Sequence, residues 1–100
     1  MQKTVETFIH QHNLSCGVEM RYIDLTSEVG ELGKEILKGS CYGQESCQIT
    51  VQAETEVGDC LFTLLALCSE MGIDAEEALR AALRKYEERI RQKGEISSGK

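Results

Sequence analysis

Two short acidic motifs recur along the chain, and their side chains have the clearest capacity for chemistry. The first, EVGE, carries Glu28 and Glu31, and the second, EVGD, carries Glu56 and Asp59. Residues three apart on a helix are neighbours on one face, so each motif forms a pair of adjacent carboxylates. Two facing pairs would supply four oxygen donors, and oxygen donors without His or Cys favour Mg²⁺ or Mn²⁺. We therefore expect a Mg²⁺ site, with Mn²⁺ as the alternative metal.

One acidic pair would be weak evidence for a metal site, because such pairs are common on the solvated faces of helices. The repeated motif makes the evidence stronger, since both copies border apolar sequence and each holds a glycine, Gly30 or Gly58. Glycine inside a helix costs about 1 kcal/mol relative to alanine. We therefore expect these glycines to let two backbones approach closely, as a quasi-symmetric helix pair. The alternative is a non-catalytic helical interaction module whose acids only keep its surface soluble.

Hydrophobic periodicity predicts the helices that position these acids. Apolar residues recur at steps of three and four over about 2–12, 17–38, 50–71 and 74–93, with polar, glycine-containing stretches between some of them. The third segment contains CLFTLLALC, which is apolar on nearly all sides. A helix of this kind is covered on most faces, so we expect it to be the central one. Short loops around an apolar interior predict an all-α fold, an antiparallel four-helix bundle.

Glycine and aspartate mark the expected helix ends. Gly39, Gly72 and Gly94 each follow the last periodic residue of a helix, where a C-terminal glycine cap belongs. Asp74 is expected to cap the start of the last helix, with Glu77 at the reciprocal capping-box position.

Length and charge narrow the classes of protein. One hundred residues make one domain, which we place at 1–93, followed by a disordered tail at 94–100. A chain of this size buries only about two thirds of its unfolded surface, so we expect a homodimer or homotetramer that assembles through its helices. The net charge of −6 disfavours a nucleic-acid partner. No apolar run reaches the roughly 18 residues of a membrane span, and no signal peptide is evident, so we expect no membrane partner and a cytoplasmic location.

The cysteine pattern indicates reduced thiols. The count of five is odd, and no two cysteines form a Cys-x-x-Cys pair, so neither a disulfide framework nor a zinc knuckle is indicated. Cys60 and Cys68 lie among apolar residues and are expected in the core. Cys41 and Cys47 flank a loop, and the sequence leaves their redox state open.

The acidic motifs resemble those of the MazG-type all-α nucleoside triphosphate pyrophosphohydrolases. The signature of that family, Glu-x-x-Glu, a spacer and Glu-x-x-Asp, reads here as EVGEL and EVGDCLF. A basic group often found on the last helix of the family is matched by KYEER, with Lys85, Tyr86 and Arg89. The resemblance covers about residues 15–92.

The resemblance implies a reaction and a set of residue roles. The reaction is Mg²⁺-dependent, house-cleaning hydrolysis of an NTP or dNTP between the α and β phosphates, giving the monophosphate and pyrophosphate. The residues that would hold the metal and carry catalysis are Glu28, Glu31, Glu56 and Asp59. One carboxylate would accept the proton of the attacking water, and which one stays open. Lys85 and Arg89 would bind phosphate oxygens unless they are solvated residues paired with nearby acids, and Lys34 is a further candidate. No tryptophan is present to stack on a base, so the base, the sugar and the choice between normal and damaged nucleotides also stay open.

Overall fold

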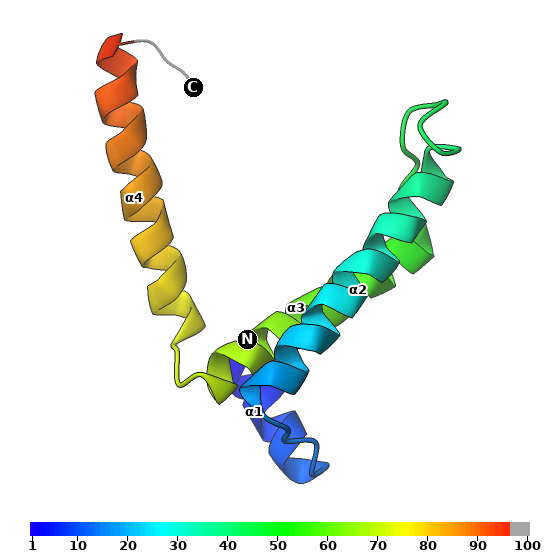
Figure 1. Cartoon of the computed structure of the whole chain (residues 1–100), viewed down its shortest axis with the longest axis vertical. Helices are drawn as coiled ribbons and strands as arrows, with labels where there is room; N and C mark the ends of the chain where they lie inside the picture. Colours follow the sequence, from blue (N-terminus) through cyan, green and yellow to red (C-terminus); the bar gives the residue numbers. More distant parts are fainter. Residues whose placement is uncertain (97–100) are drawn as a thin grey trace.

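Four α-helices and their connecting turns make up residues 1–96, the part of the chain that this computed structural model describes (Figure 1). The helices are α1 (Gln2–Gln11), α2 (Val18–Gly39), α3 (Val51–Glu70) and α4 (Ala75–Ile96). The all-α class is therefore confirmed, and the predicted helices lie within a few residues of the observed ones. None of these helices combines the length and the apolarity that a membrane crossing requires. Residues 97–100, most of the predicted tail, lie outside the described part.

α3 is the central helix, as its apolar sequence predicts. It packs along α2 and also contacts α1 (Figure 1), where the rings of Phe8 and Phe62 meet edge to face at 5.9 Å. Most buried side chains of the described region belong to α3: Ala53, Thr63, Leu65, Ala66, Leu67 and Cys68. No large side chain among the described residues is fully buried, so the core of a single chain is thin.

The turn from α3 to α4 has the predicted glycine and the predicted Asp74 cap, whereas the Glu77 carboxylate pairs with Arg80 at 2.9 Å. Gly72 has φ 70°, and the N–H of Ile73 donates to the carbonyl of Cys68 at 2.8 Å, as in a glycine-terminated helix. The Asp74 carboxylate caps α4, because it accepts hydrogen bonds from the backbone N–H groups two and three residues later, at 2.9 and 3.2 Å.

Gly39 is needed for a different reason from the one its sequence position suggests. It is the last residue of α2, but the left-handed residues come after it, at Cys41, Tyr42 and Gly43. A Cβ on Gly39 would lie 2.4 Å from the carbonyl oxygen of Gln48. The N–H of Gln48 also donates to the carbonyl of Gly39 at 2.9 Å. The returning loop therefore passes directly over Gly39 and leaves no room for a side chain.

The glycines of the two acidic motifs do not bring backbones together within the chain. A Cβ on Gly30, Gly33 or Gly58 would meet no atom within 4 Å. The prediction of a close backbone approach is therefore wrong for the single chain. The physical reason is that Gly30 and Gly58 are exposed, so they lie on the outer surface of the α2–α3 pair and not at its interface.

α4 does not close a four-helix bundle within one chain. From the turn at residues 71–74, which we call the elbow, α4 runs away from the other helices and forms a second arm (Figure 1). The Cα radius of gyration is 17.2 Å, whereas a compact domain of this length has about 13 Å. α4 also continues through Gly94 to Ile96, so the predicted stop at Gly94 is wrong. The packed unit of the single chain is the α2–α3 pair, which we call the α2–α3 arm, together with α1.

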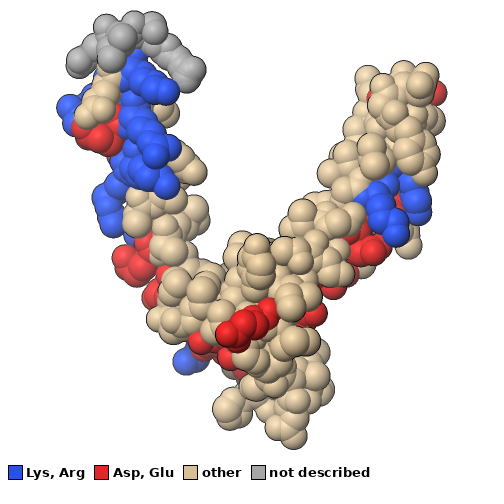
Figure 2. Space-filling view, viewed as in Figure 1, with Lys and Arg blue, Asp and Glu red and all other residues tan. Residues whose placement is uncertain are grey.

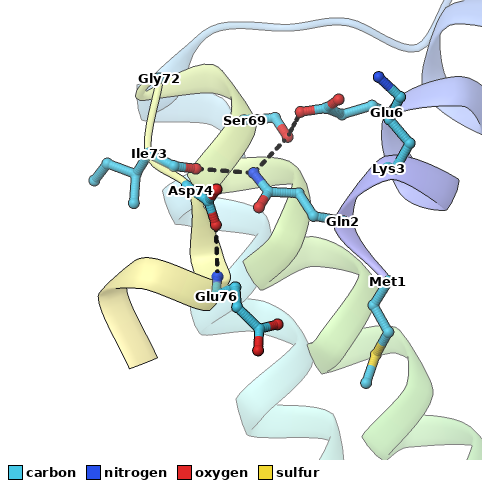
Figure 3. A pocket seen from close by; sticks show the side chains of 9 residues that line it. All are labelled: Met1, Gln2, Lys3, Glu6, Ser69, Gly72, Ile73, Asp74 and Glu76. Carbon is cyan, nitrogen blue, oxygen red and sulfur yellow. Dashed lines mark hydrogen bonds between the residues drawn. The ribbon is translucent and has the colours of Figure 1, made fainter. Parts of the chain in front are cut away.

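A side chain from α1 holds the elbow in place (Figure 3). The Gln2 amide donates to the Ser69 hydroxyl at 3.1 Å and to the Ile73 carbonyl at 2.8 Å. Its oxygen accepts from the N–H of Ala75 at 2.7 Å. Ser69 in turn donates to the Glu6 carboxylate at 2.7 Å. Gln2 therefore binds the backbone inside the elbow and at the first residue of α4, and this fixes the direction in which α4 leaves.

Replacing Gly39 by alanine should destabilise the folded chain by about 1–3 kcal/mol, the usual effect of forcing extra carbon into a packed site. The obstructing atom is a backbone oxygen 2.4 Å away, so it can move only with the loop. Gly30→Ala is the matched control, because it lies in the same helix with open space around the new Cβ. We expect it to be neutral or stabilising by up to about 1 kcal/mol. Urea unfolding followed by circular dichroism measures both, and equal stabilities would contradict this role for Gly39.

Candidate functional site

Three carboxylates from α2 and α3 converge where the two helices pack together. Glu28 comes from α2, and Glu56 and Asp59 come from α3. One carboxylate oxygen of each lies within 4.8 Å of an oxygen of each of the others. We call these three residues the carboxylate trio. The structure thus brings together three of the four acids that the sequence motifs supply.

The position of Glu56 follows from the heptad-like pattern of α3. The buried and half-buried residues of this stripe, at steps of three and four, are Ala53, Glu56, Cys60, Thr63 and Leu67. Glu56 therefore stands where a helix that packs on its neighbour ordinarily places an apolar residue. The stripe is anchored at its start by Thr50, whose hydroxyl accepts a hydrogen bond from the N–H of Ala53 at 2.9 Å.

Glu28 reaches the same place from the edge of the α2 surface. It lies one turn after Leu25 and one turn before Leu32, and all three residues are half-buried. The trio therefore combines two half-buried acids, Glu28 and Glu56, with the exposed Asp59. A site of this kind is shielded on one side by the helix pair and remains open to solvent on the other.

One carboxylate oxygen of Glu56 lacks a hydrogen-bond partner among the described residues. Its Oε1 is buried, and no described residue offers it a hydrogen bond. Burial raises the pKa of Glu56, and the charges of Asp59, Glu28, Glu31 and Glu35 raise it further. A shielded carboxylate among like charges is unfavourable unless a proton or a cation neutralises it. The donor set, the unsatisfied oxygen and the concentrated negative charge therefore fit a hard divalent cation.

Glu31, the fourth acid of the motifs, lies outside the trio. Its carboxylate contacts the Lys34 ammonium at 3.8 Å, and its side chain is 51 % exposed. It is still near enough for its charge to raise the pKa of Glu56. Lys34 is 65 % exposed, so it lies on the surface beside the acids.

Glu35 belongs to the same group of acids, although the sequence analysis did not single it out. Its side chain is only 15 % exposed, and it accepts a hydrogen bond from Lys38 at 3.3 Å. Its charge also raises the pKa of Glu56. Glu35 follows Glu28 by seven residues, which puts it two turns along the same face of α2; that spacing is the signal that could have found it. We call the trio together with Glu31 and Glu35 the acidic cluster.

The cysteines play no part in the donor set. Burial raises the pKa of the Cys60 thiol, and the charges of the neighbouring trio raise it further, so this thiol stays protonated and unreactive. Cys60 is half-buried and Cys68 is buried, as predicted for core thiols, whereas Cys41 and Cys47 are exposed. All five are free thiols in the structure.

The basic residues of α4 lie apart from the trio in a single chain. The Lys85 ammonium and the Arg89 guanidinium lie 5.1 and 5.8 Å from the centre of the Tyr86 ring. α4 leads them away from the α2–α3 arm (Figure 1), and Figure 2 shows basic side chains gathered along α4. The phosphate-binding group that the resemblance implies is therefore not assembled beside the acids within one chain.

Glu56→Gln should stabilise the metal-free protein at neutral pH, and the gain should vanish on acidification. The pKa of Glu56 is raised in the folded state. The contribution of its protonated side chain to the free energy of unfolding is therefore complete below the pKa of the unfolded state, near 4.5. That contribution is lost as the pH rises through the folded value. The glutamine of Glu56→Gln does not titrate, so it adds no such pH dependence to the stability of the variant. The measurement is thermal unfolding of both proteins in EDTA from about pH 4 to about pH 8.

The exposed Glu54 on the same helix supplies the control, because it is an acid outside the trio. Glu54→Gln should show no gain in stability at neutral pH. A metal-free wild type that is more stable than Glu56→Gln at neutral pH would contradict the electrostatic description of the site.

Comparison with known protein families matches most of the chain to one domain. Residues 19–93 match the MazG nucleotide pyrophosphohydrolase domain. The matched span contains the whole acidic cluster and the basic residues of α4, and the resemblance noted from the motifs is confirmed. No curated protein and no solved structure gives a significant match to the chain. Since the matched domain covers most of the sequence, the chain belongs to the MazG nucleotide pyrophosphohydrolase domain family, whose members are hydrolases.

Proposed function

We propose that the protein is a Mg²⁺-dependent hydrolase that cuts a nucleoside or deoxynucleoside triphosphate between its α and β phosphates. The single observation that carries the proposal is the convergence of the Glu28, Glu56 and Asp59 oxygens within 4.8 Å, in a chain of the MazG family. A triphosphate would be repelled by this site and by the net charge of −6 unless a cation intervenes. Bound Mg²⁺ would offset the phosphate charge and make water a better nucleophile.

The donor set supports Mg²⁺, with Mn²⁺ as a substitute. Mg²⁺ is usually held by a few carboxylates together with substrate phosphates and water, so the trio needs no further protein ligand. Zinc and other late transition metals prefer imidazole or thiolate. No histidine belongs to the acidic cluster, and the Cys60 thiol beside it stays protonated.

Residues outside the trio would handle the proton and the leaving group. As the water oxygen bonds to the α phosphorus and the bond to the bridging oxygen breaks, the water proton must pass to a nearby base. Glu31 suits this role, because it is half exposed and lies outside the trio. The departing pyrophosphate needs cations, for which Lys34, Lys85 and Arg89 are the candidates.

The rival function, a non-catalytic interaction module, has one observation in its favour. Apolar side chains of α4 are exposed, among them Leu83 at 57 % and Ile90 at 70 %, as at protein interaction surfaces. The two functions differ in whether the acidic cluster acts on a nucleotide. A single assay therefore separates them.

The wild-type protein should release pyrophosphate and a nucleoside monophosphate in equal amounts from at least one NTP or dNTP in the presence of Mg²⁺. Glu56→Gln and Asp59→Asn should each lower the rate by about 100-fold or more, since each removes a charged ligand of the proposed metal, which would act on the reacting groups. A panel of nucleotides with pyrophosphate detection is the measurement. Glu54→Gln, an exposed acid two residues away, should keep full activity. If no nucleotide yields pyrophosphate with Mg²⁺ or Mn²⁺, the interaction module is the better description.

Mg²⁺ should raise the melting temperature of the wild type, because it binds the folded state. Glu28→Gln should remove most of that shift, because Glu28 belongs to the trio. Glu31→Gln should keep most of the shift and still lose activity, because Glu31 lies outside the trio and is proposed to accept the proton. Thermal unfolding over a MgCl₂ titration, with EDTA as baseline, measures this. An equal loss of the shift in both variants would make Glu31 a metal ligand instead of the base.

A further inference from the structure

The side chain of Gln2, on α1, completes the N-terminal cap of α4. The first N–H groups of any helix have no partner inside that helix. In α4 the Asp74 carboxylate accepts hydrogen bonds from the N–H groups of Glu76 and Glu77, at 2.9 and 3.2 Å. The N–H of Ala75 donates instead to the Gln2 oxygen at 2.7 Å, across 73 positions of sequence. The start of α4 is therefore capped partly by its own chain neighbour and partly by a different helix.

Glutamine suits this place because its amide carries donors and an acceptor at the same time. While its oxygen accepts from Ala75, its nitrogen donates to the Ile73 carbonyl at 2.8 Å and to the Ser69 hydroxyl at 3.1 Å. The single proton of that hydroxyl goes to the Glu6 carboxylate at 2.7 Å, so the hydroxyl can only accept from Gln2. This network allows one orientation of the amide (Figure 3). We call the three hydrogen bonds of the Gln2 amide the Gln2 clamp.

α4 has no close helix packing that would set its direction in place of the clamp. The closely packed helix pairs of residues 1–96 are α2 with α3 and α1 with α3. α4 belongs to neither pair and leaves the elbow as a separate arm (Figure 1). Its direction relative to the α2–α3 arm therefore depends on the elbow and on the Gln2 clamp.

The length of α4 multiplies any change of angle at the elbow. At about 1.5 Å per residue, Lys85 and Arg89 lie about 15 and about 21 Å along the helix axis from Ala75. A tilt of about 10° at the elbow would move them by about 3 and about 4 Å. An error of about 1 Å in the place of a group that acts on a substrate can cost about 100-fold in rate. Cations on such a helix are useful to a reaction only if the elbow is stiff.

We propose that Gln2 is a positioning residue for the proposed reaction. Its amide holds α4 in the direction in which Lys85 and Arg89 act on the phosphates of the substrate, although Gln2 itself touches neither metal nor nucleotide. The inference rests on the proposed function and deepens it, because it makes the rate depend on a helix that holds none of the reacting groups. Ser69 and Glu6 support this role, since they orient the amide.

Hydrogen exchange measured by mass spectrometry tests the clamp without any assay of activity. In Gln2→Ala, exchange in the first turn of α4 should be about tenfold faster or more, because an N–H loses its acceptor and the turn frays. Exchange in the middle of α3 should stay the same. Gln11→Ala is the matched control, being the same substitution at an exposed position of the same helix, and it should change neither segment. Unchanged exchange at the start of α4 in Gln2→Ala would overturn the proposal.

A double-mutant cycle tests the link between Gln2 and the cations. Gln2→Ala should lower kcat by about tenfold or more and leave the thermal shift by Mg²⁺ intact, because the trio is untouched. In the double variant Lys85→Ala, Arg89→Ala, the same substitution should change kcat by less than about twofold, because no cations remain to be positioned. A merely structural role would lower kcat equally in both backgrounds, and that result would overturn the proposal. So would an unchanged or higher kcat in Gln2→Ala alone, since a clamp that can be removed without loss does not position α4 for the reaction.

Gln2→Glu provides a second test that preserves the size of the side chain. The glutamate keeps an acceptor for the N–H of Ala75 but loses both donors, so exchange at α4 and kcat should lie between those of wild type and Gln2→Ala. A Gln2→Glu variant equal to wild type in both measurements would contradict the role of the amide. A nucleotide panel without turnover, beside the expected exchange result, would count against the proposed function and would leave Gln2 as the residue that fixes α4.

Discussion

The structure depends on one electrostatic constraint: a carboxylate occupies a position in the packing stripe of the central helix. Glu56 stands between Ala53 and Cys60 on α3, and its buried oxygen has no hydrogen-bond partner among the described residues. A hydrocarbon side chain at this position would pack better against α2 and would require no compensation. The surrounding acids add repulsion, which raises the pKa of Glu56. Stability is therefore reduced at the place where a divalent cation would be bound, and cation binding would restore it.

The rest of the fold keeps this position rigid. α3 contacts both α1 and α2, so the helix that carries Glu56 and Asp59 is held from two sides. Its N-terminus is capped by Thr50, and its C-terminus ends at the left-handed Gly72. Regular helices on both sides of the site allow the trio oxygens to meet within 4.8 Å without a flexible loop. α4 does not pack along the α2–α3 arm within one chain (Figure 1), so its cations and the acids of the arm belong to different structural units.

Sequence could predict the features that depend on local backbone chemistry. The helix bounds near Gly72 and Asp74 follow from a left-handed glycine and an N-terminal cap, and Glu35 could have been found from its spacing to Glu28. Other features depend on contacts between distant segments. The direction of α4 is set by Gln2, 71 residues before Ile73, and no local pattern contains that information. Gly39 is needed because of the loop carbonyl that returns over it, whereas the helix-interior glycines next to the acids border open space.

Separate placement of the cations has a physical advantage for a site of this kind. If Lys85 or Arg89 lay beside Glu56 in the resting chain, an internal ion pair would lower the pKa of that carboxylate. The same pair would compete with a divalent cation for the same oxygens. Lys34 and Lys38 pair with Glu31 and Glu35, and only acids are named among the charges that shift the pKa of Glu56, so the trio would keep its charge for a metal. Under the proposed function, cations on another helix would act on the phosphates of the substrate, where charge develops as the bond breaks, and not on the acids proposed to hold the metal.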